Sequence, residues 1–197
     1  MVENRTKYAN KIHGLLFDYG ITEDVKPLNV PERESLREPS LPLPFDTLLE
    51  SYLDLVESLT EEIQKLDETI KERAGSLKET QLLMTILGVS YYTALTIYAE
   101  LDGINRFDGD KEIVSYVGLN TVIRESGDSR IEGSISKRGS GHVRWLLVQA
   151  ANTAVHTSND ELLSQFYDRL ASRMNSQKAI MAAARKMLIS IYHMLGR

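Results

Sequence analysis

A serine beside a glycine, set among basic residues, is the part of this sequence whose residue types could do chemistry. Ser126 precedes Gly127, so its hydroxyl can be presented with little steric hindrance. The surrounding segment supplies five cations, which are Arg124, Arg130, Lys137, Arg138 and Arg144. Arginine and lysine can stabilise a pentavalent phosphate and lower the cost of forming a serine alkoxide. The pattern predicts a nucleophilic serine that acts on a phosphate, and its alternative is an ordinary turn serine.

A second candidate lies upstream, at a glycine turn between two helical patterns. An apolar run ends at Gly88-Val89-Ser90, and Thr93-Ala94 opens the next helix, which is the form of a helix-hairpin-helix. Backbone N–H groups at such a turn can hold a DNA phosphate without reading sequence. Gly88 and Ser90 are therefore predicted to contact nucleic acid, with Ser90 standing where the usual motif has a second glycine. The alternative is a plain helical hairpin.

The remaining reactive or aromatic side chains carry weaker signals. There is no cysteine, which excludes thiolate metal sites, and the four histidines are scattered along the chain. At a helix start, His142 either touches phosphate or caps the helix and faces solvent. Trp145 is expected to be buried rather than stacked on a base. Of Tyr91 and Tyr92, one is expected in the core, although either could face DNA.

Hydrophobic periodicity predicts the helices that must position these residues. An amphipathic helix is expected over 4–20, and a linker over 21–44 that contains all five prolines. Residues 45–74 follow as a coiled-coil helix, and 75–197 as a helical domain. Within that domain, helices are expected at 78–101 with a break at Gly88, 111–118, 142–156, 159–173 and 175–195. The expected fold is thus mainly α: a coiled-coil helix followed by a helical domain with a helix-hairpin-helix-like element and a Gly/Ser-rich loop over 119–141.

The coiled-coil prediction rests on one run of apolar residues spaced alternately three and four apart. Its members are Leu49, Tyr52, Val56, Leu59, Ile63, Leu66 and Ile70. Charged residues flank this seam, as in a dimeric coiled coil. The pattern favours dimerisation, and the alternative is a helix packed on its own domain.

Composition limits the possible classes. Hydrophobic residues make up 42% and charged residues 26% of the 197 residues, which excludes collagen-like and largely disordered chains. The net charge of −5 is uneven, because residues 121–197 carry 11 Lys/Arg against 6 Asp/Glu. This basic third can face phosphate even though the chain is acidic as a whole. The start of the sequence is too polar for a signal peptide and no run is long enough for a membrane span, so a cytoplasmic location is expected.

Several motifs in fixed order resemble one known family. They are Leu87-Gly88-Val89 with Thr93-Ala94, Glu100-Leu101, Arg106-Phe107, Gly118-Leu119, Glu125-Ser126-Gly127, Ile135-Ser136-Lys137-Arg138-Gly139, Arg144 with Leu147, and the tail Ala184-Arg185-Lys186 with Ile191-Tyr192. Over residues 80–195 their order and spacing are similar to the C-terminal transposase domain of the IS110/IS1111 insertion-sequence family.

This resemblance implies a role in DNA transposition. Family members join an N-terminal RuvC-like domain through a coiled coil to the C-terminal domain, and in some a structured RNA bridges donor and target DNA. The resemblance assigns Ser126 as the nucleophile that links covalently to DNA. Four carboxylates of the RuvC-like domain bind divalent metal, Mg²⁺, and complete the site across a dimer.

The N-terminal domain is where the sequence departs from the family. Residues 1–20 are similar to the last helix of the RuvC-like domain, and the family's metal-binding carboxylates lie upstream of it. The resemblance therefore assigns no metal-binding carboxylate here and predicts no metal site within this chain. The expected partners are DNA, a structured bridging RNA, a second copy of the chain and a separate RuvC-like half, without a membrane. Two hypotheses follow. The chain is the catalytic C-terminal part of a transposase, inactive alone, or it is a catalytically inactive dimeric nucleic-acid-binding fragment of a truncated or split one.

Overall fold

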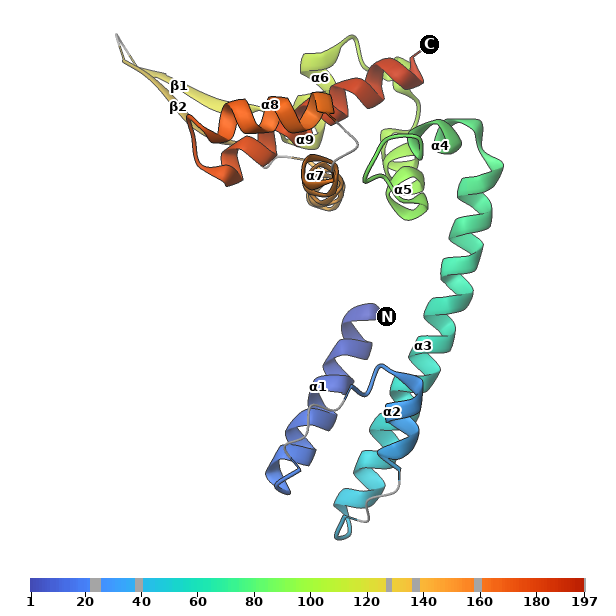
Figure 1. The fold of residues 1–197 in the computed structure, drawn as a ribbon. Helices are drawn as coiled ribbons and strands as arrows, with labels where there is room; N and C mark the ends of the chain where they lie inside the picture. Colours follow the sequence, from blue (N-terminus) through green and yellow to red (C-terminus); the bar gives the residue numbers. More distant parts are fainter. Residues whose placement is uncertain (22–25, 38–40, 127–128, 136–138, 158–160, 197) are drawn as a thin grey trace. The chain divides into compact units, whose positions relative to one another are not determined.

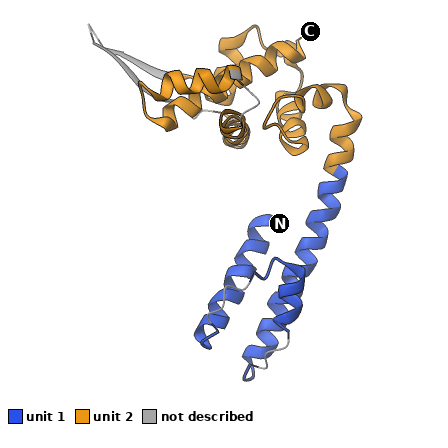
Figure 2. Cartoon of the chain, in the orientation of Figure 1, with its two compact units in different colours: residues 1–69 blue, residues 70–197 orange. Residues whose placement is uncertain are grey.

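The computed structural model describes residues 1–21, 26–37, 41–126, 129–135, 139–157 and 161–196, with only the backbone described at 121–126, 129–135 and 161. The chain divides into two compact units, residues 1–69 and 70–197 (Figure 2). Each unit is described by itself below. None of the helices in the described ranges is both long enough and apolar enough to cross a membrane.

The first unit is built from helices α1 (Val2–Asp18), α2 (Val30–Ser35) and the larger part of α3 (Phe45–Ser76) (Figure 1). Pro31 occupies the first turn of α2, where its missing N–H costs nothing. Apolar side chains from α1, from α3 and from the segment between α2 and α3 form one core. Its buried members are Ile12, Leu15, Leu16, Leu36, Leu41, Leu49, Leu53 and Val56.

The apolar seam of α3 has two different halves. Leu49 and Val56 are buried in the core of the first unit, together with Leu53, which lies outside the predicted seam. Farther along, Leu59 and Ile63 are only partly buried and Leu66 is 50% exposed. The first half therefore serves packing within the chain, which was the alternative reading of this pattern. The second half keeps apolar surface uncovered.

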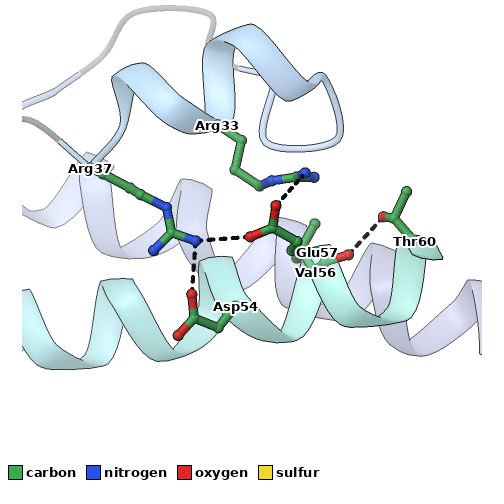
Figure 3. A network of polar contacts seen from close by, with 6 residues as sticks. All are labelled: Arg33, Arg37, Asp54, Val56, Glu57 and Thr60. Carbon is green, nitrogen blue, oxygen red and sulfur yellow. Dashed lines mark hydrogen bonds and ion pairs between the residues drawn. The ribbon is translucent and has the colours of Figure 1, made fainter. Parts of the chain in front are cut away.

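An ion-pair network joins α2 to α3 (Figure 3). The Arg33 guanidinium, only 4% exposed, donates to Glu57 at 3.3 Å. Arg37 bridges Asp54 at 2.8 Å and Glu57 at 3.1 Å. Hydrogen bonding to Asp54 raises the pKa of Arg37 above its ordinary value. The network thus joins two arginines to two carboxylates, with the Arg33 side chain buried and the other three side chains partly or largely exposed.

The second unit holds the remaining elements, and it confirms the mainly α prediction. In order they are α4 (Lys78–Leu83), α5 (Tyr91–Leu101), the 3-10 turn η1 (Ile104–Arg106), α6 (Asp110–Val117), β1 (Thr121–Ser126), β2 (Ser129–Ile135), α7 (Gly141–His156), α8 (Glu161–Ala171) and α9 (Ser176–Leu195). Helix α9 packs against α4, α6, α7 and α8. Its buried face includes Ala179, Ala183 and Ala184, whose small side chains allow close approach.

The segment predicted as a Gly/Ser-rich loop contains an antiparallel β-hairpin instead. Thr121 pairs with Ile135, Ile123 with Glu132, and Ser126 with Ser129, with an irregularity between Thr121 and Ile123. The glycines and serines of this segment are typical of turns. Its β-branched residues favour strands, however, and strand pairing outweighs the turn signal. The loop prediction was therefore wrong for the paired residues.

Two glycines allow backbone segments of the second unit to meet. Gly88 lies in the turn between α4 and α5 with φ +86°, and a Cβ there would overlap the Ala150 carbonyl of α7. Gly139 has φ +109°, and a Cβ there would overlap the Tyr116 carbonyl of α6. Both positions therefore need glycine for conformation and for space. They hold α5 and α6 close to α7.

Candidate nucleic-acid interface

Ser126 is the last residue of strand β1. It pairs with Ser129 of β2, and residues 127 and 128 complete the connection between the strands. The position is thus the last paired residue of β1. Gly127 lies outside the described residues, so the predicted Ser-Gly pair is placed only through its serine backbone.

The cations predicted around Ser126 are placed unequally. Arg124 precedes Ser126 by two positions on β1 and pairs with Ile131, while Arg130 of β2 pairs with Glu125. Because residues two apart in a strand belong to the same face, positions 124 and 126 share one face of the hairpin. The other two cations of the segment, Lys137 and Arg138, lie outside the described residues.

Arg144 lies in the first turn of α7 and is tied to α6. Its Nη1 donates a hydrogen bond to the Val117 carbonyl at 2.9 Å, and the residue is half-buried. A guanidinium has five N–H donors, so this bond leaves others for a ligand. Ser140 caps the same helix by accepting a hydrogen bond from the Val143 N–H at 3.4 Å. Arg144 is therefore held in a defined place at the start of α7.

The segment between α4 and α5 contains both candidate residues of the predicted helix-hairpin-helix, and both have structural roles. Gly88 meets the α7 backbone, as described above. The Ser90 hydroxyl caps α5, accepting from the Thr93 N–H at 3.2 Å and lying 3.1 Å from the Thr93 hydroxyl. The serine in place of the usual second glycine thus provides a helix cap. Ordinary packing and capping account for both residues, and contact with nucleic acid stays a prediction.

Three aromatic side chains gather where α5 and α7 begin, and sequence analysis did not group them. Tyr92 comes from the first turn of α5, and His142 and Trp145 come from the start of α7. Trp145 is 55% exposed, so the expectation that it is buried was wrong. Trp145 lies outside the buried face of α7, which includes Val143, Leu146, Leu147, Ala150, Ala151 and Ala154. That helical spacing is the signal that could have placed Trp145 at the surface.

Two of the other histidines are engaged elsewhere in the second unit, and His13 lies in α1 of the first unit. His193 Nε2 lies 3.0 Å from Asp110, and the His156 ring packs edge-on against Tyr167. Across the described residues no three His, Asp or Glu side chains gather as a metal-binding group. Where the metal-binding carboxylates lie stays a prediction.

Comparison with known proteins supplies the family. Residues 80–168, which run from α4 into α8 and include the hairpin, match the model of the Transposase IS116/IS110/IS902 family. The match covers Gly88, Ser90, Ser126 and Arg144 together. It therefore spans the candidate residues discussed above.

Curated relatives extend the similarity to the whole chain. The transposase for insertion sequence element IS1111A of Coxiella burnetii is 29% identical over 208 residues, covering 100% of this chain and 56% of that protein. A probable family 20 transposase of Pseudomonas aeruginosa is 24% identical, covering 100% and 60%. The transposase for IS1328 of Yersinia enterocolitica is 27% identical, covering 90% and 52%. The chain thus spans little more than half the length of these relatives. Residues 80–168 thus match a transposase family model, and the similarity to curated transposases extends over the whole chain, which confirms the resemblance seen in the sequence.

Proposed function

We propose that this chain is the C-terminal part of an insertion-sequence transposase and that Ser126 is its nucleophile on a DNA phosphodiester. The observation that carries the proposal is the place of Ser126 at the last paired position of β1. A residue at the end of a hairpin ladder can meet an extended strand of DNA without opening the helical core. The family match across residues 80–168 supports a transposase role for the segment that contains it.

The proposed step is a transesterification at phosphorus. The Ser126 hydroxyl loses its proton as its Oγ attacks, an Oγ–P bond forms, and the bond to one bridging sugar oxygen breaks. The sugar oxygen leaves as a hydroxyl once it takes a proton. Arg124, which shares a hairpin face with Ser126, and Arg144 at the start of α7 would hold phosphate oxygens and offset the charge that develops.

Divalent metal is assigned in this proposal to a RuvC-like domain rather than to this chain. The acidic side chains that the structure describes do not form a metal-binding group. We therefore route no step of the serine chemistry through Mg²⁺ bound here. The chain alone is proposed to bind DNA without cleaving it, and a RuvC-like half supplied with it completes the reaction.

The hairpin offers a matched pair of variants to test the nucleophile. Ser126→Ala removes the hydroxyl on β1, and Ser129→Ala removes the one paired with it on β2. With a RuvC-like half and Mg²⁺ present, we expect Ser129→Ala to form a denaturation-resistant DNA adduct and Ser126→Ala to form none, while both bind DNA. An adduct with Ser126→Ala would overturn the assignment. If neither variant nor the parent chain forms one, the catalytically inactive binding fragment becomes the better description.

Nucleic-acid binding by the chain is a separate part of the proposal. Cations that neutralise phosphates release counterions, so affinity for DNA falls as salt rises. The cations that bind DNA are also proposed to bind a structured bridging RNA, and we expect the affinity for that RNA to fall with salt in a similar way. Fluorescence anisotropy of labelled duplex DNA and labelled RNA, measured at increasing salt, checks both. An affinity that does not change with salt would contradict phosphate contact.

Dimerisation is proposed through the uncovered second half of the α3 seam. Leu59, Ile63 and Leu66 continue the apolar spacing beyond the core of the first unit, and Leu66 is half exposed. Leu66→Lys places a charge in that seam, whereas Leu55→Lys places one at an exposed position of α3 outside it. Sedimentation equilibrium should show a dimer for the parent chain and Leu55→Lys and a monomer for Leu66→Lys. A dimer in all three would place the interface elsewhere.

A further inference from the structure

We propose that Tyr92, His142 and Trp145 form a stacking surface for an unpaired nucleobase of a bound nucleic acid. This inference rests on the proposed function, since it assumes that the chain binds nucleic acid. It adds a site that neither the family match nor the sequence motifs assign. The ligand class is single-stranded DNA or RNA, whose unpaired base offers the same flat π face in both cases.

The three rings are arranged as one layered group. His142 stacks on Trp145 with ring centroids 6.1 Å apart and an interplanar angle of 20°. Tyr92 meets His142 edge-on, at 6.0 Å and 81°. The Tyr92 hydroxyl lies 3.1 Å from His142 Nε2, within hydrogen-bond distance, and this contact orients the imidazole between the two helices. The stack is thus fixed from both helices, with Trp145 as its outer ring.

These side chains are not used by the hydrophobic core. Trp145 is 55% and Tyr92 39% exposed, and His142 is exposed as well. A tryptophan normally contributes a large apolar area to a core or an interface, so leaving one in water forfeits that stabilisation. The indole here keeps a large uncovered surface next to an ordered partner ring. A further flat ring can therefore add to the stack without any rearrangement of the core.

Charge favours a nucleic acid as the occupant. Helices α5 and α7 both begin beside the stack, and neither has an acidic residue in its first turn. The partial positive charge of a helix N-terminus is therefore not offset locally at either helix. Arg144 lies between His142 and Trp145 in the sequence, so a further cation stands at the start of α7. A base on Trp145 would thus bring its phosphate towards positive rather than negative potential.

The stacking geometry further selects an unpaired base over a duplex. Bases within a duplex already stack on their neighbours, so their faces are closed to a protein ring. An unpaired base exposes its face, and stacking on an aromatic side chain tolerates any base identity. We expect preference for single strands and little preference for sequence.

The chain itself provides the readout, because Trp145 is its only tryptophan. The full chain is titrated with unlabelled oligothymidylate, with oligouridylate and with a duplex of the same length, while tryptophan emission is recorded. A stacked base should quench this emission, so we expect quenching by either single strand and much less by the duplex. Quenching by only one single strand identifies DNA or RNA as the preferred source of the base.

Variants then link quenching to affinity, which is measured by anisotropy of a labelled oligothymidylate. Trp145→Ala should weaken single-strand binding roughly five- to hundredfold, the usual loss for one base–aromatic stack. Trp145→Phe keeps a ring and should recover most of this affinity. The control is Phe17→Ala, which removes another exposed aromatic side chain, from α1 of the first unit, and should leave affinity unchanged.

The outcomes separate this inference from the proposed function. Single-strand binding that falls with salt, without quenching and without loss in Trp145→Ala, overturns the stacking surface and leaves the proposed function standing. If the parent chain changes the anisotropy of none of the labelled DNA and RNA probes, the proposed function is overturned, and the stacking surface with it. Circular dichroism of Trp145→Ala checks that its helices are intact, and Trp145→Phe gives a second test if they are not.

Discussion

The two units of this chain hold their helices together in different ways. In the first unit, contacts between side chains join the helices: the Tyr8 and Tyr52 rings meet at 5.8 Å, Leu53 fills the core, and Arg37 bridges to Asp54. In the second unit, glycines let the backbone come close, with the Gly88 turn against Ala150 of α7. Each unit has a buried hydrophobic core of its own.

The two units differ in which of their side chains are free to contact a ligand. In the first unit, Arg33 and Arg37 are already paired with Glu57 and Asp54, so the network has little charge to offer a ligand. In the second unit, Val89, Val143 and Leu147 form the core near the starts of α5 and α7. Three larger rings of the same region, those of Tyr92, His142 and Trp145, stay exposed.

The largest expected effect comes from breaking the close backbone contact. Gly88→Ala forces a Cβ into the Ala150 carbonyl and keeps a left-handed φ, so we expect a loss of about 3 kcal/mol or more in the free energy of unfolding. Gly103→Ala is the matched control, because Gly103 has φ +93° but open space around it, and roughly 1 kcal/mol is expected. Urea denaturation followed by Trp145 fluorescence reports the second unit. Equal losses in both variants would show that the packing contact is unimportant.

The corresponding side-chain contact of the first unit is tested at Leu53. Its side chain is fully buried, so Leu53→Ala leaves a cavity and should cost about 3 kcal/mol. Leu55→Ala, two positions along the same helix and 41% exposed, should change stability by less than about 0.5 kcal/mol. Denaturation followed by far-UV circular dichroism measures both. If Leu53→Ala proved as mild as its control, the first unit would not depend on this core.

Arg144 sharpens the comparison, because it joins two helices of the second unit through a side chain. Arg144→Met removes the hydrogen bond to the Val117 carbonyl and should cost about 1.5 kcal/mol. Arg173→Met removes an exposed cation from the same unit and should have little effect on stability. The DNA affinity of Arg144→Met and Arg173→Met separates a structural role of Arg144 from a binding role. A loss of affinity in a folded Arg144→Met would support phosphate contact. Unchanged affinity would leave Arg144 a structural residue.

The smallest effect is expected in the ion-pair network. Glu57→Gln weakens the partner of buried Arg33 and should cost about 1 kcal/mol, limited by the solvent exposure of the carboxylate. Glu62→Gln breaks an exposed pair with Lys65 on the same helix and should have no measurable effect.

The raised pKa of Arg37 predicts how stability depends on pH. The contribution of Arg37 to the free energy of unfolding is present below its ordinary pKa and is lost only as pH rises above the raised value. Stability from Arg37 should therefore stay constant from neutral to mildly alkaline pH.

Much of the helical order follows from the sequence alone. The apolar spacing and the glycine stops predict helices close to α1, α3 and α5 through α9, because a helix that packs one face must repeat its apolar residues every three or four positions. Prolines predict the interruption between α1 and α3 for an equally local reason. The ordered motifs around Ser126 identify the transposase family without any coordinates.

What the sequence left open depended on contacts between distant segments. The segment around Ser126 contains both turn formers and β-branched residues, and only the pairing of β1 with β2 decides between them. The apolar repeat of α3 predicts a seam but not its partner, which for Leu49 and Val56 is the core of the same unit. The contact between Tyr92 and His142 likewise required tertiary structure, because 50 residues separate the two rings in the chain. Periodicity is a local property and determines elements, whereas side-chain neighbours are set by how those elements pack.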